Sequence, residues 1–119
     1  SIHTPLNDET INMVNYDFLK KFSKKIFFIN TSRGKIVNTC DLIKNIKIGG
    51  ILGTGLDVLE YENNSFEKLT KKGKQELNFL IKSPKVILTP HIAGWSTESN
   101  KLMCQILTKK ILSHLKSIS

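Results

Sequence analysis

Cysteines and long apolar runs are scarce in this chain, and each shortage excludes a class of protein. The two cysteines, Cys40 and Cys104, lie far apart and show no Cys-x-x-Cys or Cys/His spacing. That spacing excludes a zinc ribbon and argues against a disulfide framework, so we expect two reduced thiols. Lys, Asn or Gly interrupts every hydrophobic segment before the ~18 residues that span a bilayer. We therefore expect a soluble, cytoplasmic protein without a membrane partner.

The opening residues show neither a methionine nor the pattern expected of a secretory signal. It begins at Ser1, and residues 1–6 contain no basic stretch followed by an apolar one. We interpret the N-terminus as cut. With 119 residues, of which 39% are hydrophobic, the chain is long enough for one modest core. We expect one domain or a piece of one.

Acidic residues are outnumbered, with 10 Asp and Glu against 18 Lys and Arg and a formal net charge of +8. Such an excess attracts phosphates, nucleic acids or anionic metabolites. The lysines fall in short clusters in a chain rich in Asn and Ile, at Lys20-Lys21, Lys24-Lys25, Lys71-Lys72 and Lys109-Lys110. Clusters of this kind are usually solvated helix faces. A nucleic-acid-binding module is therefore the weakest interpretation, and salt-sensitive association with nucleic acid would identify it.

Apolar runs alternate with helical patterns, which is the arrangement of βα units around a mostly parallel sheet. The pattern predicts an α/β fold. Strands are expected at residues 25–30, 51–59 and 86–88, and helices at 15–21, from Thr39 as cap to Gly49-Gly50, at 75–81 and from Ser96 onward. The polar residues 60–74 predict an irregular surface loop with a turn at Asn63-Asn64-Ser65.

Three polar clusters follow the predicted strands, at residues 30–34, 57–62 and 89–94. The carboxyl ends of parallel strands line the ligand crevice in open sheets, so these clusters can form one site. The guanidinium of Arg33 suits a planar carboxylate, although a lone Arg is normally a solvated or ion-paired surface residue. His91 can change protonation near neutrality, although a structural histidine is an equal alternative. The 57–62 segment offers His91 a carboxylate, and composition does not say which.

Metal binding fits these residues less well. One loop histidine and scattered carboxylates do not form a ligand spacing such as H-E-x-x-H. We therefore expect no metal site.

The motifs of the chain resemble those of the D-isomer-specific 2-hydroxyacid dehydrogenases, a family that includes phosphoglycerate, glycerate, formate and D-lactate dehydrogenases. The matching motifs run in family order through nearly the whole chain, as HTPL at residues 3–6 through Thr10, FINTSRG at 28–34, GTGLDVLE at 53–60 and LTPHIAG at 88–94. The resemblance implies the second half of a Rossmann-like NAD-binding domain with a parallel sheet in residues 1–95. It implies that residues 96–119 form a C-terminal helix that returns to the substrate domain.

The resemblance also assigns roles to single residues. As catalytic residues it implies Arg33, which anchors and polarises the substrate, Glu62, which orients the histidine, and His91, which exchanges the proton. The positions that match the family's NAD site are Thr4, Pro5, Thr10, Thr31, Ser32, Arg33, Asp57 and His91. On the same alignment Glu60 is an exposed neighbour and Asn30 holds the strand end. The family's glutamate is commonly followed by proline, whereas Asn63 follows here and loosens the loop.

The implied function is NAD-dependent hydride transfer between nicotinamide and a D-2-hydroxy or 2-oxo acid, with 3-phosphoglycerate and serine biosynthesis as the preferred guess and a homodimer as the assembly. The G-x-G-x-x-G turn that seats the pyrophosphate is absent from the chain. We therefore expect a fragment of such an enzyme that is inactive when isolated. A decayed or split gene product is the alternative within the family. The substrate and the choice between NAD and NADP lie beyond this sequence.

Overall fold

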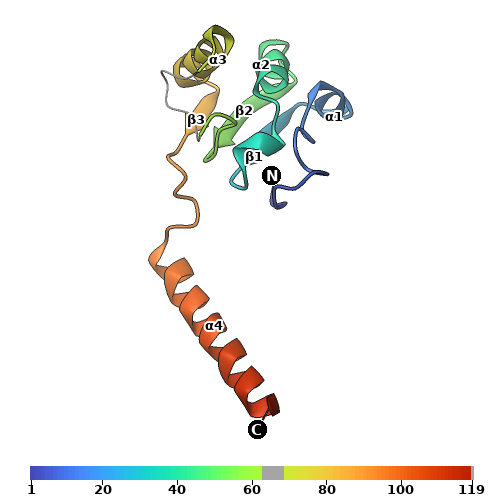
Figure 1. Ribbon diagram of the computed structural model, residues 1–119. Helices are drawn as coiled ribbons and strands as arrows, with labels where there is room; N and C mark the ends of the chain where they lie inside the picture. Colours follow the sequence, from blue (N-terminus) through green and yellow to red (C-terminus); the bar gives the residue numbers. More distant parts are fainter. Residues whose placement is uncertain (63–68, 119) are drawn as a thin grey trace.

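A computed structural model of the chain describes residues 1–62 and 69–118. Its elements, in chain order, are α1 (Tyr16–Lys20), β1 (Ile26–Asn30), the 3-10 turn η1 (Gly34–Ile36), α2 (Thr39–Lys47), β2 (Ile51–Leu56), α3 (Lys71–Lys82), β3 (Val86–Leu88) and α4 (Thr97–Ile118). Strands and helices alternate, and helices α1, α2 and α3 lie on one side of the strands (Figure 1). The predicted α/β class is confirmed.

The three strands form a parallel sheet in the order β1-β2-β3. Asn30 of β1 pairs with Leu56 of β2, and Leu56 pairs with Leu88 of β3, so the last residues of all three strands stand in one row. Parallel pairing requires crossovers, which α2 and α3 supply. Everything that follows a strand therefore emerges at the same edge of the sheet.

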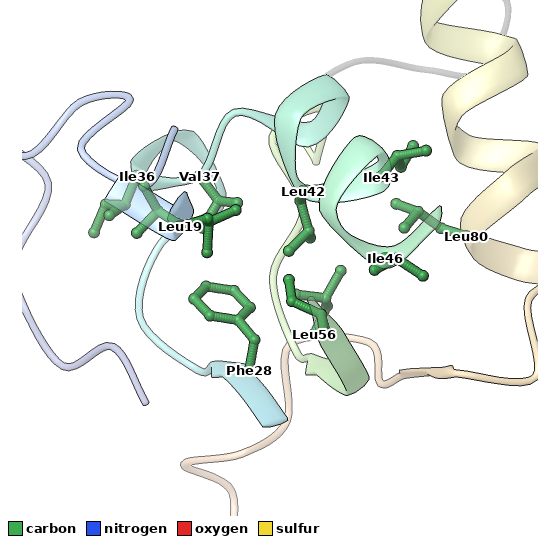
Figure 2. Packing of buried hydrophobic residues seen from close by; sticks show 11 residues of the cluster. Leu19, Phe28, Ile36, Val37, Leu42, Ile43, Ile46, Leu56 and Leu80 are labelled. Atoms are coloured by element: carbon green, nitrogen blue, oxygen red, sulfur yellow. The ribbon is translucent and has the colours of Figure 1, made fainter. Parts of the chain in front are cut away.

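The core lies between the sheet and the helices. Alternate strand residues point toward α2 and α3, and the stripe of Leu42, Ile43 and Ile46 on α2 packs against them. Figure 2 shows Phe28 of β1 and Leu56 of β2 directed toward this stripe, with Leu80 of α3 on its other side. Burial of these side chains is the dominant stabilising term of the fold.

The opposite face of the sheet is open among the described residues. Phe27, Ile29, Leu52 and Ile87 alternate with the core residues and remain exposed. They line a shallow cavity of about 440 Å³. A parallel sheet is normally covered on both faces. This face has the apolar composition of a covered face, but none of the described residues covers it.

Several predicted boundaries are wrong by a few residues. Helix α2 is capped by Asn38, whose side chain accepts from the backbone N–H of Asp41, whereas Thr39 is its first residue. Strand β2 ends at Leu56 rather than near residue 59. Helix α3 begins at Lys71 rather than Gln75, because Thr70 caps it by accepting from the N–H of Gly73. The predicted turn at 63–65 lies outside the described residues.

The last helix stands apart from the rest of the chain, as Figure 1 shows. It begins one residue after Ser96, whose hydroxyl accepts from the backbone N–H of Ser99 as an N-cap does. Its apolar side chains, from Leu102 to Leu115, are exposed. The radius of gyration of 18.0 Å exceeds the roughly 14 Å of a compact domain of this length because of this extension.

Candidate active site

Two backbone hydrogen bonds continue the sheet beyond its last row and bring the three polar clusters to one edge. The N–H of Asp57 donates to the carbonyl of Asn30 at 3.0 Å, and the N–H of Thr89 donates to the carbonyl of Leu56 at 3.1 Å. The segments that follow β1, β2 and β3 therefore leave the sheet side by side. The predicted convergence of the clusters on one edge is confirmed.

Asn30 holds the turn after β1. Its side chain is fully buried, donates to the carbonyl of Arg33 at 3.0 Å and accepts from the N–H of Ser32 at 3.0 Å. Both ends of the amide are thus used within the turn. The expectation that Asn30 holds the strand end is confirmed.

The turn after β1 forms one wall of an open cleft of about 610 Å³. The cleft is lined by His3, Thr4, Pro5, Leu6, Thr31, Ser32 and Arg33. The Ser32 hydroxyl donates to the carbonyl of Thr4 and ties the N-terminal segment to the turn. Arg33 is exposed, and its Nη1 donates to the carbonyl of Ser32 at 2.7 Å, which leaves the remaining guanidinium donors toward solvent.

Among the predicted cofactor residues that the structure describes, Thr4 is the one with a buried polar side-chain atom that has no partner. Its Oγ1 is buried and unpaired while the residue lines the cleft. A buried hydroxyl without a partner costs free energy, so a polar ligand group in the cleft would relieve it. Thr10 behaves differently: it is buried, its hydroxyl donates to the carbonyl of Pro5 at 2.7 Å, and it shapes the loop rather than lining the cleft.

Asp57 organises the turn after β3. Its carboxylate accepts from the Thr89 hydroxyl and from the N–H groups of Ile92 and Ala93, both at 2.9 Å. Burial of Asp57 acts to raise its pKa, but the hydrogen bonds from Thr89, Ala93 and Ile92 outweigh it, and the pKa lies below its usual value. An ionised Asp57 therefore holds this turn closed.

His91 sits in that turn in a left-handed backbone conformation, with φ of 57°. Such a conformation is uncommon outside glycine, and the hydrogen bond from its N–H to the carbonyl of Asp57 helps to hold it. The imidazole Nδ1 lies 2.6 Å from Oε1 of Glu62, and both side chains are partly exposed. Because a carboxylate only accepts, Nδ1 carries the proton in this pair and Nε2 is left for another partner.

The structure thus brings His91 together with Glu62 and Asp57. The neighbouring cleft at the same edge is formed by other predicted site residues, namely Thr4, Pro5, Thr31, Ser32 and Arg33. Arg33 and His91, both within the described part of the chain, are not joined to each other by a hydrogen bond or an ion pair. Of the two neighbouring glutamates, the structure pairs Glu62 with the histidine. The composition of 57–62 alone had left that choice open.

One expectation about this edge is wrong, and one residue was missed. Glu60 is not simply an exposed neighbour, because its Oε2 accepts from the N–H of Thr39 at 2.9 Å at the start of α2. Thr89 was not singled out, although its hydroxyl bonds to Asp57. Its position directly after a predicted strand and before Pro90 was the available signal.

Comparison with known proteins decides the family. Residues 1–93 match the family model for the D-isomer specific 2-hydroxyacid dehydrogenase, NAD binding domain. The chain belongs to this family.

Relatives support the assignment along most of the chain. A glyoxylate reductase of Thermococcus litoralis is 37% identical over 116 residues, which are 98% of this chain and 32% of that protein. A putative D-lactate dehydrogenase of Dictyostelium discoideum is 37% identical over 108 residues, covering 87% of this chain and 32% of that protein. The NAD-complexed D-isomer specific 2-hydroxyacid dehydrogenase of Lactobacillus delbrueckii ssp. bulgaricus superposes with a TM-score of 0.73 at 37% identity, covering 97% of this chain and 36% of that one.

The family assignment confirms the resemblance, the Rossmann-like fold and NAD as the cofactor of the matched domain. The chain spans only about a third of the length of these relatives. Within the described residues, no helix is long and apolar enough to cross a membrane. Nor do the described residues contain a group of three or more His, Cys, Asp or Glu side chains placed to hold a metal ion.

Proposed function

We propose that this chain is the part of an NAD-dependent D-2-hydroxyacid dehydrogenase that carries its acid–base pair and its substrate arginine. The pairing of His91 Nδ1 with Glu62 Oε1 at 2.6 Å, beside the Arg33 turn, is the observation that supports the proposal most directly. An exposed histidine held by a carboxylate at the carboxyl edge of a parallel sheet has the geometry of a general acid–base.

The His91 imidazole moves the proton of the reaction. Oxidation of a 2-hydroxy acid releases the hydroxyl proton, which the free Nε2 accepts, and reduction of a 2-oxo acid takes that proton back. Glu62 stabilises the imidazolium that forms and fixes the tautomer, because its carboxylate holds the proton on Nδ1. NAD, when bound, supplies the nicotinamide ring that accepts or returns the hydride.

Arg33 fixes the substrate in this proposal. Its free guanidinium donors suit the planar carboxylate that all 2-hydroxy and 2-oxo acids share, and positioning that group presents one face of the reacting carbon. The cleft beside Arg33 fits the cofactor, since the unpaired Thr4 Oγ1 offers a hydrogen bond to a polar group there. Pro5, Thr31 and Ser32 would line the same groove, and Asp57 and His91 would meet its nicotinamide end.

The identity of the substrate and the oligomeric state of the whole enzyme are further parts of the proposal. The relatives named above are a glyoxylate reductase and a putative D-lactate dehydrogenase, so glyoxylate and pyruvate are the first substrates to test. 3-Phosphoglycerate, and with it a place in serine biosynthesis, belongs in the same panel. We further propose that residues 1–95 belong to the NAD-binding domain, that 96–119 return to a substrate domain, and that the whole enzyme is a cytoplasmic homodimer.

A chimera tests the proposed function. The matching segment of the Thermococcus litoralis glyoxylate reductase is replaced by this chain, and NADH-dependent reduction of glyoxylate, pyruvate and 3-phosphohydroxypyruvate is measured. We expect turnover, a loss of about 10²–10⁴-fold in kcat for His91→Gln, and a raised KM for Arg33→Lys, whose single ammonium cannot bind bidentately.

The chimera has a matched control in His114→Gln, which changes an exposed histidine on α4 and should leave turnover unchanged. A folded chimera that binds NADH but whose turnover is indifferent to His91→Gln would rule the proposed chemistry out.

A further inference from the structure

Glu62 needs a defined position to hold His91, and the described residues that carry it, from the end of β2 at Leu56 to Glu62, form no helix or strand. Within the described part of this connection, a backbone hydrogen bond from the N–H of Glu62 to the carbonyl of Leu59, at 3.1 Å, closes a turn over residues 59–62. The question is what fixes this turn to the rest of the domain.

Within the part of the chain that the structure describes, three contacts fix it, and they come from three elements. The carbonyl of Leu59 packs against Gly34 so closely that a Cβ added at Gly34 would lie 1.9 Å from the carbonyl oxygen. Glu60 Oε2 accepts from the N–H of Thr39 at 2.9 Å, and the hydroxyl of Tyr61 donates to Oε2 of Glu76 on α3. The side chains on either side of the turn's centre therefore point to helices α2 and α3.

The Glu60 contact ties the turn to the start of α2. It joins a carboxylate to the first residue of a nine-residue helix, where the backbone N–H groups lack intrahelical partners and the helix dipole favours negative charge. Asn38, the N-cap, already serves the N–H of Asp41, so Glu60 serves a different donor of the same turn. A charge-assisted hydrogen bond of this kind is about twice as strong as a neutral one.

We infer that Glu60 is a positioning residue: by binding the N-terminus of α2 it holds the 59–62 turn in the place where Glu62 meets His91. The inference rests on the proposed role of the Glu62–His91 pair. It gives a function to a glutamate two residues from the pairing carboxylate, and it explains how the pair forms although Asn63, rather than a proline, follows Glu62.

The donor can be removed from the other side of the contact, which gives the inference a sharp test. Thr39 is the first residue of α2, a position that accepts proline because its N–H is not used within the helix. The preceding Asn38 is extended, with φ of −74° and ψ of 109°, as a residue before proline must be. Thr39→Pro therefore deletes the N–H that Glu60 accepts from, while the helix still forms and residue 60 is still a glutamate.

The readout is the Nδ1–H proton of His91 in the NMR spectrum of the 119-residue chain, whose exchange with water we expect to be slowed while Glu62 accepts it. Glu62→Gln identifies the resonance by shifting it. We expect Glu60→Ala and Thr39→Pro each to broaden or abolish it, and the double variant to do no more than either. Glu60→Gln retains an acceptor oxygen and should restore most of the signal.

Two controls separate positioning from general loss of structure. Thr39→Val keeps the N–H and the shape but not the hydroxyl, and Glu98→Ala removes a glutamate from the first turn of α4 instead of α2. Both should keep the resonance, and α2 amide shifts should stay native in Thr39→Pro. A resonance that persists in Glu60→Ala and Thr39→Pro would overturn the inference. Because no turnover is measured, an inactive chimera would contradict the proposed function and leave this result standing.

Discussion

At the scale of single residues, the carboxylate of Asp57 accepts three hydrogen bonds from the turn after β3. Its buried carboxylate ties the strand β2 to the turn that carries His91, through Thr89, Ile92 and Ala93. The resemblance assigned it a contact with nicotinamide, and a carboxylate held this firmly can serve both purposes. Its ionisation therefore affects the stability of the domain as well as its chemistry.

The lowered pKa of Asp57 predicts a defined dependence of stability on pH. The unfolded chain binds the proton more tightly, so the stabilisation by Asp57 is complete above about pH 4 and is lost as the pH falls through the folded pKa. Asp57→Asn should lower the free energy of unfolding by about 1–3 kcal/mol at neutral pH. Urea unfolding at neutral and acidic pH should show this difference shrink on acidification.

A second variant makes the prediction for Asp57 specific. Thr89→Val removes one of the hydrogen bonds to the carboxylate and should lose part of the same pH-dependent stability. An Asp57→Asn difference that stays constant from neutral to acidic pH would contradict the assigned cause.

At the scale of elements, the sequence predicts which helices and strands exist better than it predicts the residues at which they begin and end. All three strands and the helices α1, α2, α3 and α4 are expected from the alternation of continuous apolar runs with helical apolar patterns, since burial in a core imposes both. Thr39 is expected as the cap of α2 because Thr caps helices well, but in the fold it is the Asn38 side chain that accepts from a free N–H group of the helix. The partner of Glu60 lies 21 residues away, which no local pattern indicates.

The start of α3 is the largest boundary error and yields a prediction. The stretch Lys71–Lys74 is too polar to show periodicity, but Thr70 caps it through Gly73, and the N–H of Lys74 donates to the carbonyl of Thr70. Thr70→Ala should destabilise the helix start by about 1 kcal/mol. Amide exchange at Gly73 and Lys74 should then quicken, while Thr70→Ser keeps the cap. Unchanged exchange in Thr70→Ala would favour the later start at Gln75.

At the scale of the whole molecule, two apolar surfaces of the described residues lie uncovered. One is the open sheet face of Phe27, Ile29, Leu52 and Ile87, and the other is the set of apolar side chains on α4. Lys20 and Lys47, by contrast, lie in the last turns of α1 and α2 and complement the helix dipoles, whereas Lys71 and Lys72 open α3. Uncovered apolar area of this extent is the property of the 119-residue chain that most affects its behaviour in solution.

The open sheet face predicts self-association of the chain. Phe27 and Ile87 are 73% and 71% exposed, so Phe27→Lys with Ile87→Lys should turn the face polar without disturbing the core behind it. Ile48→Lys is the matched control, because Ile48 is 69% exposed but lies at the end of α2, away from the sheet face. Sedimentation velocity over a range of concentrations should show association of the parent chain and of the control, and weaker association of the double variant, in which the apolar side chains of α4 remain uncovered. A parent chain that sediments as a monomer at every concentration would contradict this prediction, because the apolar face would then remain exposed to water without driving association. Its apolar side chains would then reflect strand propensity rather than a surface in need of cover.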